Sequence, residues 1–177
     1  MVLPELTEFP NFPISKSIIE AVTPFHLASR IGNFMAMCKS IVDSVENKSP
    51  RDELNGETPL HYAVCSGNYE ICQMIIERIE DKNPKDNIDW TPLHEAAKRG
   101  HLNICQLIAK YTNNKNPQSS IHKITPLDQA VNEGHLEVVT FFCEIIREKN
   151  PKSVYTRHTP LQIPPKVWRL CFLSIPN

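Results

Sequence analysis

Glycine is scarce in this chain, with five residues among 177, and no two of them are close together. A loop that cradles a phosphate group needs several nearby glycines, so no such loop is available here. The sequence also lacks G-x-S-x-G, the motif around the serine of many hydrolases. His94-Glu95 is no zinc-protease motif, because Lys98 stands where H-E-x-x-H needs its second histidine. These absences argue against an enzyme, and we expect neither a cofactor nor a metal.

An excess of charge and a long apolar run are also missing. The chain has 19 basic and 20 acidic side chains, and this balance argues against a general nucleic-acid-binding surface. No run of 18 apolar residues occurs, so we expect no membrane insertion. Residues 1–22 do not show the basic-then-apolar pattern of a secretory signal. Six cysteines fall on expected helices rather than in a spaced disulfide framework, which indicates reduced thiols. We therefore expect a cytoplasmic or nuclear protein, and a monomer.

A repeated motif fills most of the chain. TPFHLASRIG begins at Thr23, TPLHYAVCSG at Thr58, TPLHEAAKRG at Thr91, TPLDQAVNEG at Thr125 and a broken TPLQ at Thr159. The spacings are 35, 33, 34 and 34 residues. A fixed period of this size indicates stacked structural repeats that share one continuous core.

One unit has the start and stop signals of a helix. Thr91 is a good N-cap residue, because its hydroxyl can accept from an orphan backbone N–H. Pro92 follows at the first helical position, where its missing N–H is not needed. Ala96 and Ala97 favour a helix and allow close packing. Gly100 marks the end, where a left-handed residue is wanted. A second helix follows, with apolar residues at helical spacing in residues 71–79, 104–111 and 138–146.

The T-P-L-H-x-A motif at this period resembles the ankyrin-repeat family, over roughly residues 23–158. The resemblance implies an all-α solenoid of helix–turn–helix units joined by short β-turn fingers. It implies that His61 and His94 tie one repeat's turn together and reach the neighbouring repeat. In this motif His94 stands where a capping box would have Glu or Gln, so we expect a different capping arrangement.

The repeat starts divide the chain into six segments. Pro164 and Pro165 fall where the first helix of a fifth repeat would run, and they forbid that helix. Repeat 1 has a poorer apolar face than the others, so we expect it to be the least ordered repeat or an N-terminal cap. The segments are an irregular tail or partial cap (1–22), a degenerate repeat 1 (23–57), repeat 2 (58–90), repeat 3 (91–124), repeat 4 (125–158) and a truncated or degenerate repeat 5 (159–177).

The connections between repeats differ from the common family pattern. The family ends its second helix with a Gly-Ala pair, which this chain lacks. We therefore expect each second helix to run about one turn longer and to stop at an Xaa-Pro pair such as Asn83-Pro84. Asn55-Gly56 predicts a tight turn in the first finger. Asp89, Lys123 and Arg157 replace the family's glycine in the later fingers, so we expect the third and fourth fingers to be looser or differently shaped.

Cys38, Cys72 and Cys105 recur at one position of the repeat. Equivalent positions in stacked helices are about 10 Å apart, whereas zinc ligands must all lie within about 2.3 Å of one point. We therefore interpret these cysteines as buried core residues. The histidines of the TPLH motifs are interpreted as structural, and His101 and His135 as residues that stabilise the turn after the helix-ending glycine.

The candidate binding residues follow from the resemblance. Ankyrin repeats contact partners mainly through the fingers and the exposed ends of the first helices, on the concave side. Here the residues before each TP and before each helix-ending glycine change from unit to unit. Trp90 has two interpretations, an interface residue or one that packs on the adjacent finger. Lys98 and Arg99 are either partner contacts or solvated charges that complement the helix dipole. The candidates are Glu57, Cys65, Ser66, Trp90, Lys98, Arg99, Ile124, Asn132, Glu133 and His158.

The expected function is a non-catalytic scaffold that binds a protein partner of unknown identity through its concave face. One alternative is a fragment of a larger multidomain protein, such as a channel, kinase or adaptor, whose catalytic or membrane part is absent. The broken fifth repeat favours that alternative. A remote alternative is a thiol-dependent enzyme.

Overall fold

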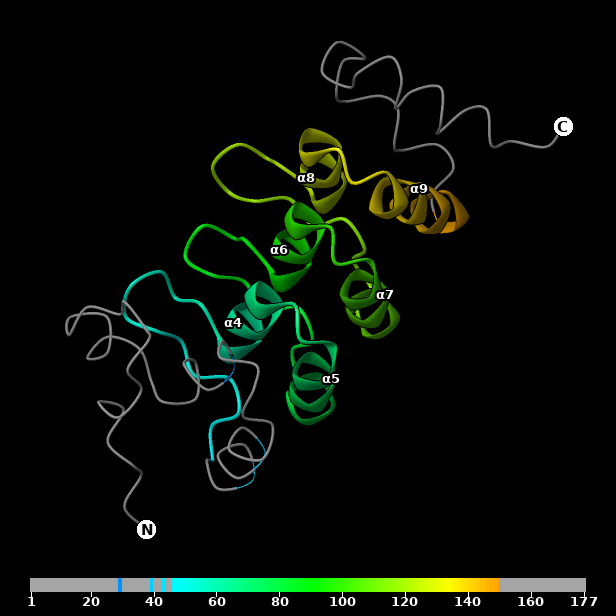
Figure 1. Cartoon of the computed structure of the whole chain (residues 1–177). Coiled ribbons are helices and arrows are strands. Elements are labelled where there is room, and N and C mark those ends of the chain that lie inside the picture. Colours follow the sequence, from blue (N-terminus) through cyan, green and yellow to red (C-terminus); the bar gives the residue numbers. More distant parts are fainter. Residues whose placement is uncertain (1–28, 30–38, 40–42, 44–45, 150–177) are drawn as a thin grey trace, which may run out of the picture.

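The computed structural model describes Ser29, Lys39, Asp43 and residues 46–149. This part of the chain contains six long helices in three successive pairs (Figure 1). The first helices of the pairs form one layer and the second helices form another. The three loops that precede the first helices project from the opposite side of that layer. Among the described residues, no helix is long and apolar enough to cross a membrane.

The first helices are α4 (Pro59–Ser66), α6 (Pro92–Arg99) and α8 (Pro126–Glu133). Each begins directly after a threonine N-cap in extended conformation, with proline at the first helical position. Each ends at a left-handed glycine. At Gly100, for example, φ is 74°, and the next N–H, that of His101, bonds back to Ala96 O at 3.0 Å. The threonine, proline and glycine signals therefore predicted all three helices correctly.

The second helices are α5 (Tyr69–Arg78), α7 (Leu102–Tyr111) and α9 (Leu136–Lys149). The expectation that every second helix runs to an Xaa-Pro pair is wrong for α5 and α7. Backbone extension at Ile79 and Thr112 ends these two helices well before Asn83 and Asn116. Of the three, α9 alone continues to the residue before its Asn-Pro pair.

Two side chains explain the early ends of α5 and α7. The Lys82 ammonium donates to the carbonyls of Ile76 and Ile79, and so satisfies groups that a longer helix would have used. Asn83 accepts a hydrogen bond at 3.1 Å from the N–H of Leu93, in the first turn of α6. The equivalents in the next repeat are Lys115, which donates to Thr112 O, and Asn116, which accepts from Leu127 N at 3.1 Å. The asparagine side chain thus caps an N–H in the first turn of the following repeat, and it lies beyond the end of its own second helix.

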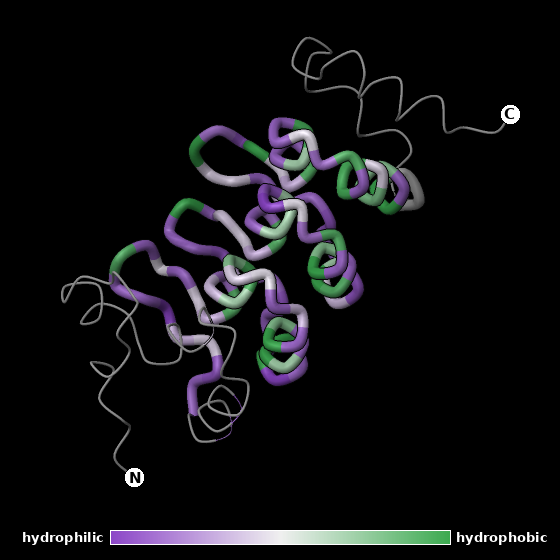
Figure 2. Tube along the Cα trace, viewed as in Figure 1, coloured by the Kyte–Doolittle hydropathy of each residue, from purple (hydrophilic) through white to green (hydrophobic). Residues whose placement is uncertain are grey.

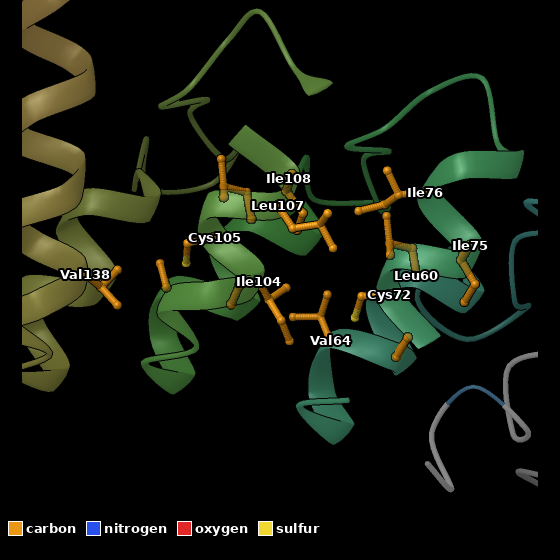
Figure 3. Packing of buried hydrophobic residues seen from close by; sticks show 14 of the residues in the cluster. Leu60, Val64, Cys72, Ile75, Ile76, Ile104, Cys105, Leu107, Ile108 and Val138 are labelled. Atoms are coloured by element: carbon orange, nitrogen blue, oxygen red, sulfur yellow. The ribbon is translucent and has the colours of Figure 1, made fainter. Parts of the chain in front are cut away.

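One apolar core runs through all three pairs. Figure 3 shows side chains from α4, α5, α7 and α9 meeting between the two helical layers. Leu60, Leu93, Ile104 and Ile108 are almost completely buried. Burying such a side chain contributes about 1.5–3 kcal/mol, so the array depends on contacts between neighbouring repeats. Leu93, the leucine of the T-P-L-H motif, belongs to this core.

The loops before the first helices are the fingers, here called the first (51–57), second (84–90) and third (117–124) fingers. Each is closed by a hydrogen bond from an N–H near its start to the carbonyl of its last residue. The pairs are Asp52–Glu57 at 2.9 Å, Asp86–Trp90 at 2.8 Å and Ser119–Ile124 at 2.9 Å.

The expected loosening of the third finger is not seen. Lys123 adopts a left-handed φ of 54°, close to the 58° of Asp89 and the 72° of Gly56. A left-handed conformation at a residue other than glycine costs roughly 1–2 kcal/mol. The closing hydrogen bond and the contact with the second finger hold Lys123 in this conformation.

The TPLH histidines of α4 and α6 connect these helices to the next repeat by hydrogen bonds. His94 Nδ1 accepts from the backbone N–H of Thr91 at 3.1 Å, and its Nε2 donates to Ile124 O at 3.0 Å. His61 repeats the pattern with Thr58 N at 3.0 Å and Trp90 O at 3.3 Å. The link to the neighbouring repeat is as expected. The expectation of a different capping arrangement is wrong. A capping box is present, and histidine takes the place that Glu or Gln usually has in it.

Several predictions lie outside the described residues. They concern the tail 1–22, most of repeat 1 with Cys38, the fourth finger with Arg157 and His158, and residues 159–177. Within repeat 1, Ser29, Lys39 and Asp43 are helical, and Asp43 lies 3.5 Å from the guanidinium of Arg78.

Candidate functional site

The predicted binding residues lie at the two ends of the first helices, where a finger joins the N-terminus and where the helix stops before its glycine. Ser66, Lys98, Arg99, Asn132 and Glu133 end the first helices and are exposed. Three others close the fingers and are half-buried, and Cys65 is half-buried in the last turn of α4. The finger residues are Glu57, Trp90 and Ile124.

Trp90 joins the second finger to α6. Its indole ring stacks on His94, with ring centroids 4.7 Å apart and an angle of 23° between the planes. Its indole N–H points to Glu95 Oε2 at 3.4 Å. Both contacts are with α6, the helix that directly follows the second finger, whereas one interpretation of the sequence placed the ring on the adjacent finger. Trp90 is half-buried in this arrangement.

Glu95 connects three of the predicted residues. Arg99 Nε donates to Glu95 Oε1 at 2.6 Å, one helical turn along α6. The Cys65 thiol donates to the same oxygen at 3.4 Å, across the gap between repeats 2 and 3. The guanidinium of Arg99 also lies 3.6 Å from the Cys65 sulfur. Cys65, Trp90, Glu95 and Arg99 thus form one connected cluster, which we call the Glu95 cluster.

Charge and burial set the protonation states in the Glu95 cluster. Burial alone would raise the pKa of Glu95, but the hydrogen bond and positive charge of Arg99 outweigh it, and the pKa is lowered. Burial, followed by the negative charge of Glu95, raises the pKa of Cys65 to about 12. At neutral pH the cluster therefore holds a carboxylate, a guanidinium and a neutral thiol.

Ile124, Lys98, Asn132 and Glu133 lie away from the Glu95 cluster or use their backbone elsewhere. Ile124 O accepts from His94, and its N–H donates to Ser119 Oγ at 3.1 Å, so its backbone is structural. The carbonyl of Lys98 accepts from His135 Nε2 at 2.9 Å. The lysine itself is exposed. Asn132 and Glu133 lie one repeat further on, at the end of α8.

The two histidines after the helix-ending glycines also link repeats. The His101 ring lies against Gly67 and the His135 ring against Gly100, each in the preceding repeat. A Cβ at Gly100 would come within 2.6 Å of the His135 ring. The structure therefore places these rings at the contact between repeats, and the turn-stabilising role stays a prediction.

Sequence reasoning missed Glu95, although a signal was present. The position after each TPL-His or TPL-Asp holds Tyr62, Glu95 and Gln129 in successive repeats. This position therefore varies between repeats as much as the positions that we selected as candidate binding residues. Sequence reasoning also missed three apolar residues at the finger tips, Leu54, Ile88 and Ile121, which are exposed.

The recurring cysteines belong to the core. Cys72 and Cys105 are completely buried, as predicted, and burial raises the pKa of each to about 12. In the part of the chain that the structure describes, no group of three or more His, Cys, Asp or Glu side chains is arranged to hold a metal ion.

A comparison with known families agrees with this geometry. The family described as ankyrin repeats (three copies) matches residues 9–86 and 79–153. No curated protein matches the chain. Ankyrin repeats are generally protein–protein interaction modules. The matched residues cover most of the chain, and the paired helices, left-handed glycines and TPLH interlock lie within them, so the chain belongs to the ankyrin-repeat family.

Proposed function

We propose that this protein is a non-catalytic scaffold that binds a protein partner along the surface between the fingers and the ends of the first helices, on the concave side of the array. One observation carries the proposal. The repeated frame residues Thr91, His94 and Leu93 are buried, whereas the finger-closing and helix-ending positions that change between repeats are exposed or half-buried. A constant frame with variable exposed positions is the arrangement that a specificity surface requires.

The chemistry of this surface suits a protein ligand. Trp90 is a half-buried tryptophan at the start of α6, and tryptophan is enriched among residues that dominate binding energy. Beside it, the half-buried Glu95 pairs with the exposed Arg99, while Lys98 and Glu133 present single charges from neighbouring helices. An apolar anchor surrounded by charges of both signs provides affinity at the centre and specificity at the rim.

The thiol chemistry argues against an enzyme. A thiolate is the reactive form of cysteine, and the raised pKa values of Cys65, Cys72 and Cys105 keep these thiols protonated at neutral pH. Glu95 accepts a hydrogen bond from the Cys65 thiol, but its own lowered pKa makes it a weak base.

The test compares two surfaces in affinity capture with the intact chain as bait. Changing Trp90, Lys98 and Arg99 together to Ala removes three surface side chains at the two ends of α6. We expect partner capture to be lost, because truncating an interface Trp or Arg often costs 2 kcal/mol or more, about thirtyfold in affinity. The matched control changes Gln73, Gln106 and Lys110 on the second helices to Ala and should leave capture intact.

Trp90 and Arg99 also make contacts inside the molecule, so the melting temperature of the triple variant must be compared with that of the parent. A companion variant, Lys98→Ala with Glu133→Ala, changes only exposed side chains at the ends of α6 and α8. It should weaken capture without changing the melting temperature. If the control set abolishes capture and the other two variants do not, the partner uses the second helices and the proposal fails.

A further inference from the structure

Three exposed aliphatic side chains occupy the tips of the successive fingers. Leu54, Ile88 and Ile121 are 50%, 40% and 60% exposed. Figure 2 shows a hydrophobic (green) stretch at the tip of each of the three fingers, next to hydrophilic (purple) residues. We call these three residues the tip ridge. An aliphatic side chain in the turn of each of three successive fingers is a recurring feature rather than scattered exposure.

Hydrogen bonds between the fingers hold the tip ridge in place. The N–H of Asn87 donates to Asn55 O at 2.9 Å, and the N–H of Ser120 donates to Ile88 O at 2.9 Å. Within the first finger, Asp52 Oδ1 accepts from the backbone N–H groups of residues 54, 55 and 56. The tips are therefore ordered before any partner arrives, which reduces the entropy lost on binding.

The charges of the fingers change along the ridge. In the first finger the base Arg51 and the acid Glu53 are exposed, Glu57 is half-buried, and Asp52 is buried. The second finger has Lys85 against two acids, and Lys85 is already paired with Asp89 at 2.9 Å. Residues 117–124, the third finger, contain Lys123 and no acid. A complementary partner is therefore basic at the end near the first finger and acidic at the end near the third.

Repeat spacing decides the conformation of that partner. Neighbouring repeats, and with them the tips, are about 10 Å apart, the ordinary distance between packed helices. An α-helix rises about 10.5 Å in seven residues and returns to nearly the same face. An extended strand covers the same distance in about three residues, which point to opposite faces. A helix with an aliphatic residue at every seventh position can therefore meet all three tips.

We infer that the tip ridge binds an amphipathic α-helix of a partner protein, with the N-terminus of that helix over the third finger. The helix dipole favours this direction, because acids are stabilised at helix N-termini and bases at C-termini. The helix then places acids beside Lys123 and bases beside Glu53. The inference rests on the proposed function, since it names the segment of the partner that the tips of the same fingers take.

The test uses a synthetic helical peptide of about three heptads, with Leu at every seventh position, Glu in the first turn and Lys in the last. We expect saturable binding to the intact chain that weakens as salt is added. Ile88→Ser should weaken binding about tenfold or more, since burial of one aliphatic side chain has about that value. Leu136→Ser, at an equally exposed apolar residue of α9, should leave binding unchanged.

Four outcomes overturn the inference. They are absence of binding, equal binding of a peptide with its end charges exchanged, tighter binding of a proline-rich peptide with Leu at every third position, and self-association of the chain that Ile88→Ser abolishes. Failure here is distinguishable from failure of the proposed function. If Lys98→Ala with Glu133→Ala loses capture of the natural partner while Ile88→Ser keeps it, the scaffold stands and the tip ridge does not.

Discussion

At the residue scale, the two buried histidines show how a single side chain joins two repeats. His61 and His94 each use one ring nitrogen to accept inside their own turn and the other to donate to the next repeat. Both roles require the neutral ring. Burial lowers the pKa of each from 6.5 to about 4, against smaller opposing effects of the backbone hydrogen bonds.

This lowered pKa predicts a stability that depends on pH. Between pH 6.5 and about 4 the unfolded histidines bind more protons than the folded ones, so stability is complete above pH 6.5 and falls with decreasing pH. We expect a loss of roughly 2 kcal/mol per buried histidine between pH 7 and pH 5. His94→Gln keeps a capping-box acceptor and should remove about half of this dependence, as measured by urea unfolding at several pH values. His122→Gln, at an exposed position of the third finger, is the control. An unchanged pH slope in His94→Gln contradicts the account.

The Cys65 thiol gives a second prediction at this scale. Its raised pKa predicts slow alkylation by iodoacetamide at pH 7 and a rate that still increases above pH 9. Glu95→Gln removes the neighbouring negative charge and should increase the rate. Mass spectrometry of the labelled chain measures both. A fast reaction at neutral pH would favour the thiol-enzyme alternative.

Sequence and structure agree best where a residue acts within its own turn. Thr91, Pro92 and Gly100 predicted the start and end of α6, because capping depends on only a few neighbouring residues. Glu95 was missed because its role depends on Cys65 in another repeat. Comparing equivalent positions of successive repeats shows that such a position varies. The comparison does not show which side chain of another repeat the residue contacts.

At the scale of the element, the ends of α5 and α7 show the same limit. The prolines predicted a stop, and the helices do end before them, but the position of the stop depends on Lys82 and Asn83. Asn83 accepts a hydrogen bond from the first turn of the next first helix, α6. Local helix propensity cannot predict such a contact between repeats. Likewise, Lys123 keeps a left-handed conformation because the neighbouring finger and the closing hydrogen bond outweigh its local preference.

The packing of α6 predicts the effect of two core substitutions. Leu93 and Ala96 are completely buried. Leu93→Ala should reduce the free energy of unfolding by about 2–5 kcal/mol, because it leaves a cavity. Ala96→Leu should reduce it by about 1–3 kcal/mol, because it overfills the contact between helices. Urea unfolding measures both, with the exposed Gln106→Ala as control. Parent-like unfolding of both variants would show that α6 does not pack as described.

At the scale of the whole molecule, burial changes at the last described repeat. Leu127 and Phe141 are half-buried, whereas their equivalents Leu93 and Leu107 are buried. The apolar side chains of α8 and α9 are thus more exposed than the equivalent side chains of α6 and α7. Terminal repeats need a cover to remain soluble.

Truncation after Gln162 tests the contribution of the C-terminal segment 163–177. Pro164 and Pro165 preclude a helix at the place where the first helix of a fifth repeat would run, so the far-UV helix signal should hardly change. Solubility should fall, because Trp168, Leu170 and Phe172 are apolar groups that can cover the open end. A large loss of helix signal on truncation contradicts this prediction.

The central claim is that a protein partner binds between the fingers and the first helices. Hydrogen–deuterium exchange of the chain, alone and with its captured partner, tests this claim most directly. We predict slower exchange in residues 84–90 and in the last turn of α6, with no change on the exposed sides of α5 and α7. Protection of α5 and α7 with unchanged fingers would contradict the account.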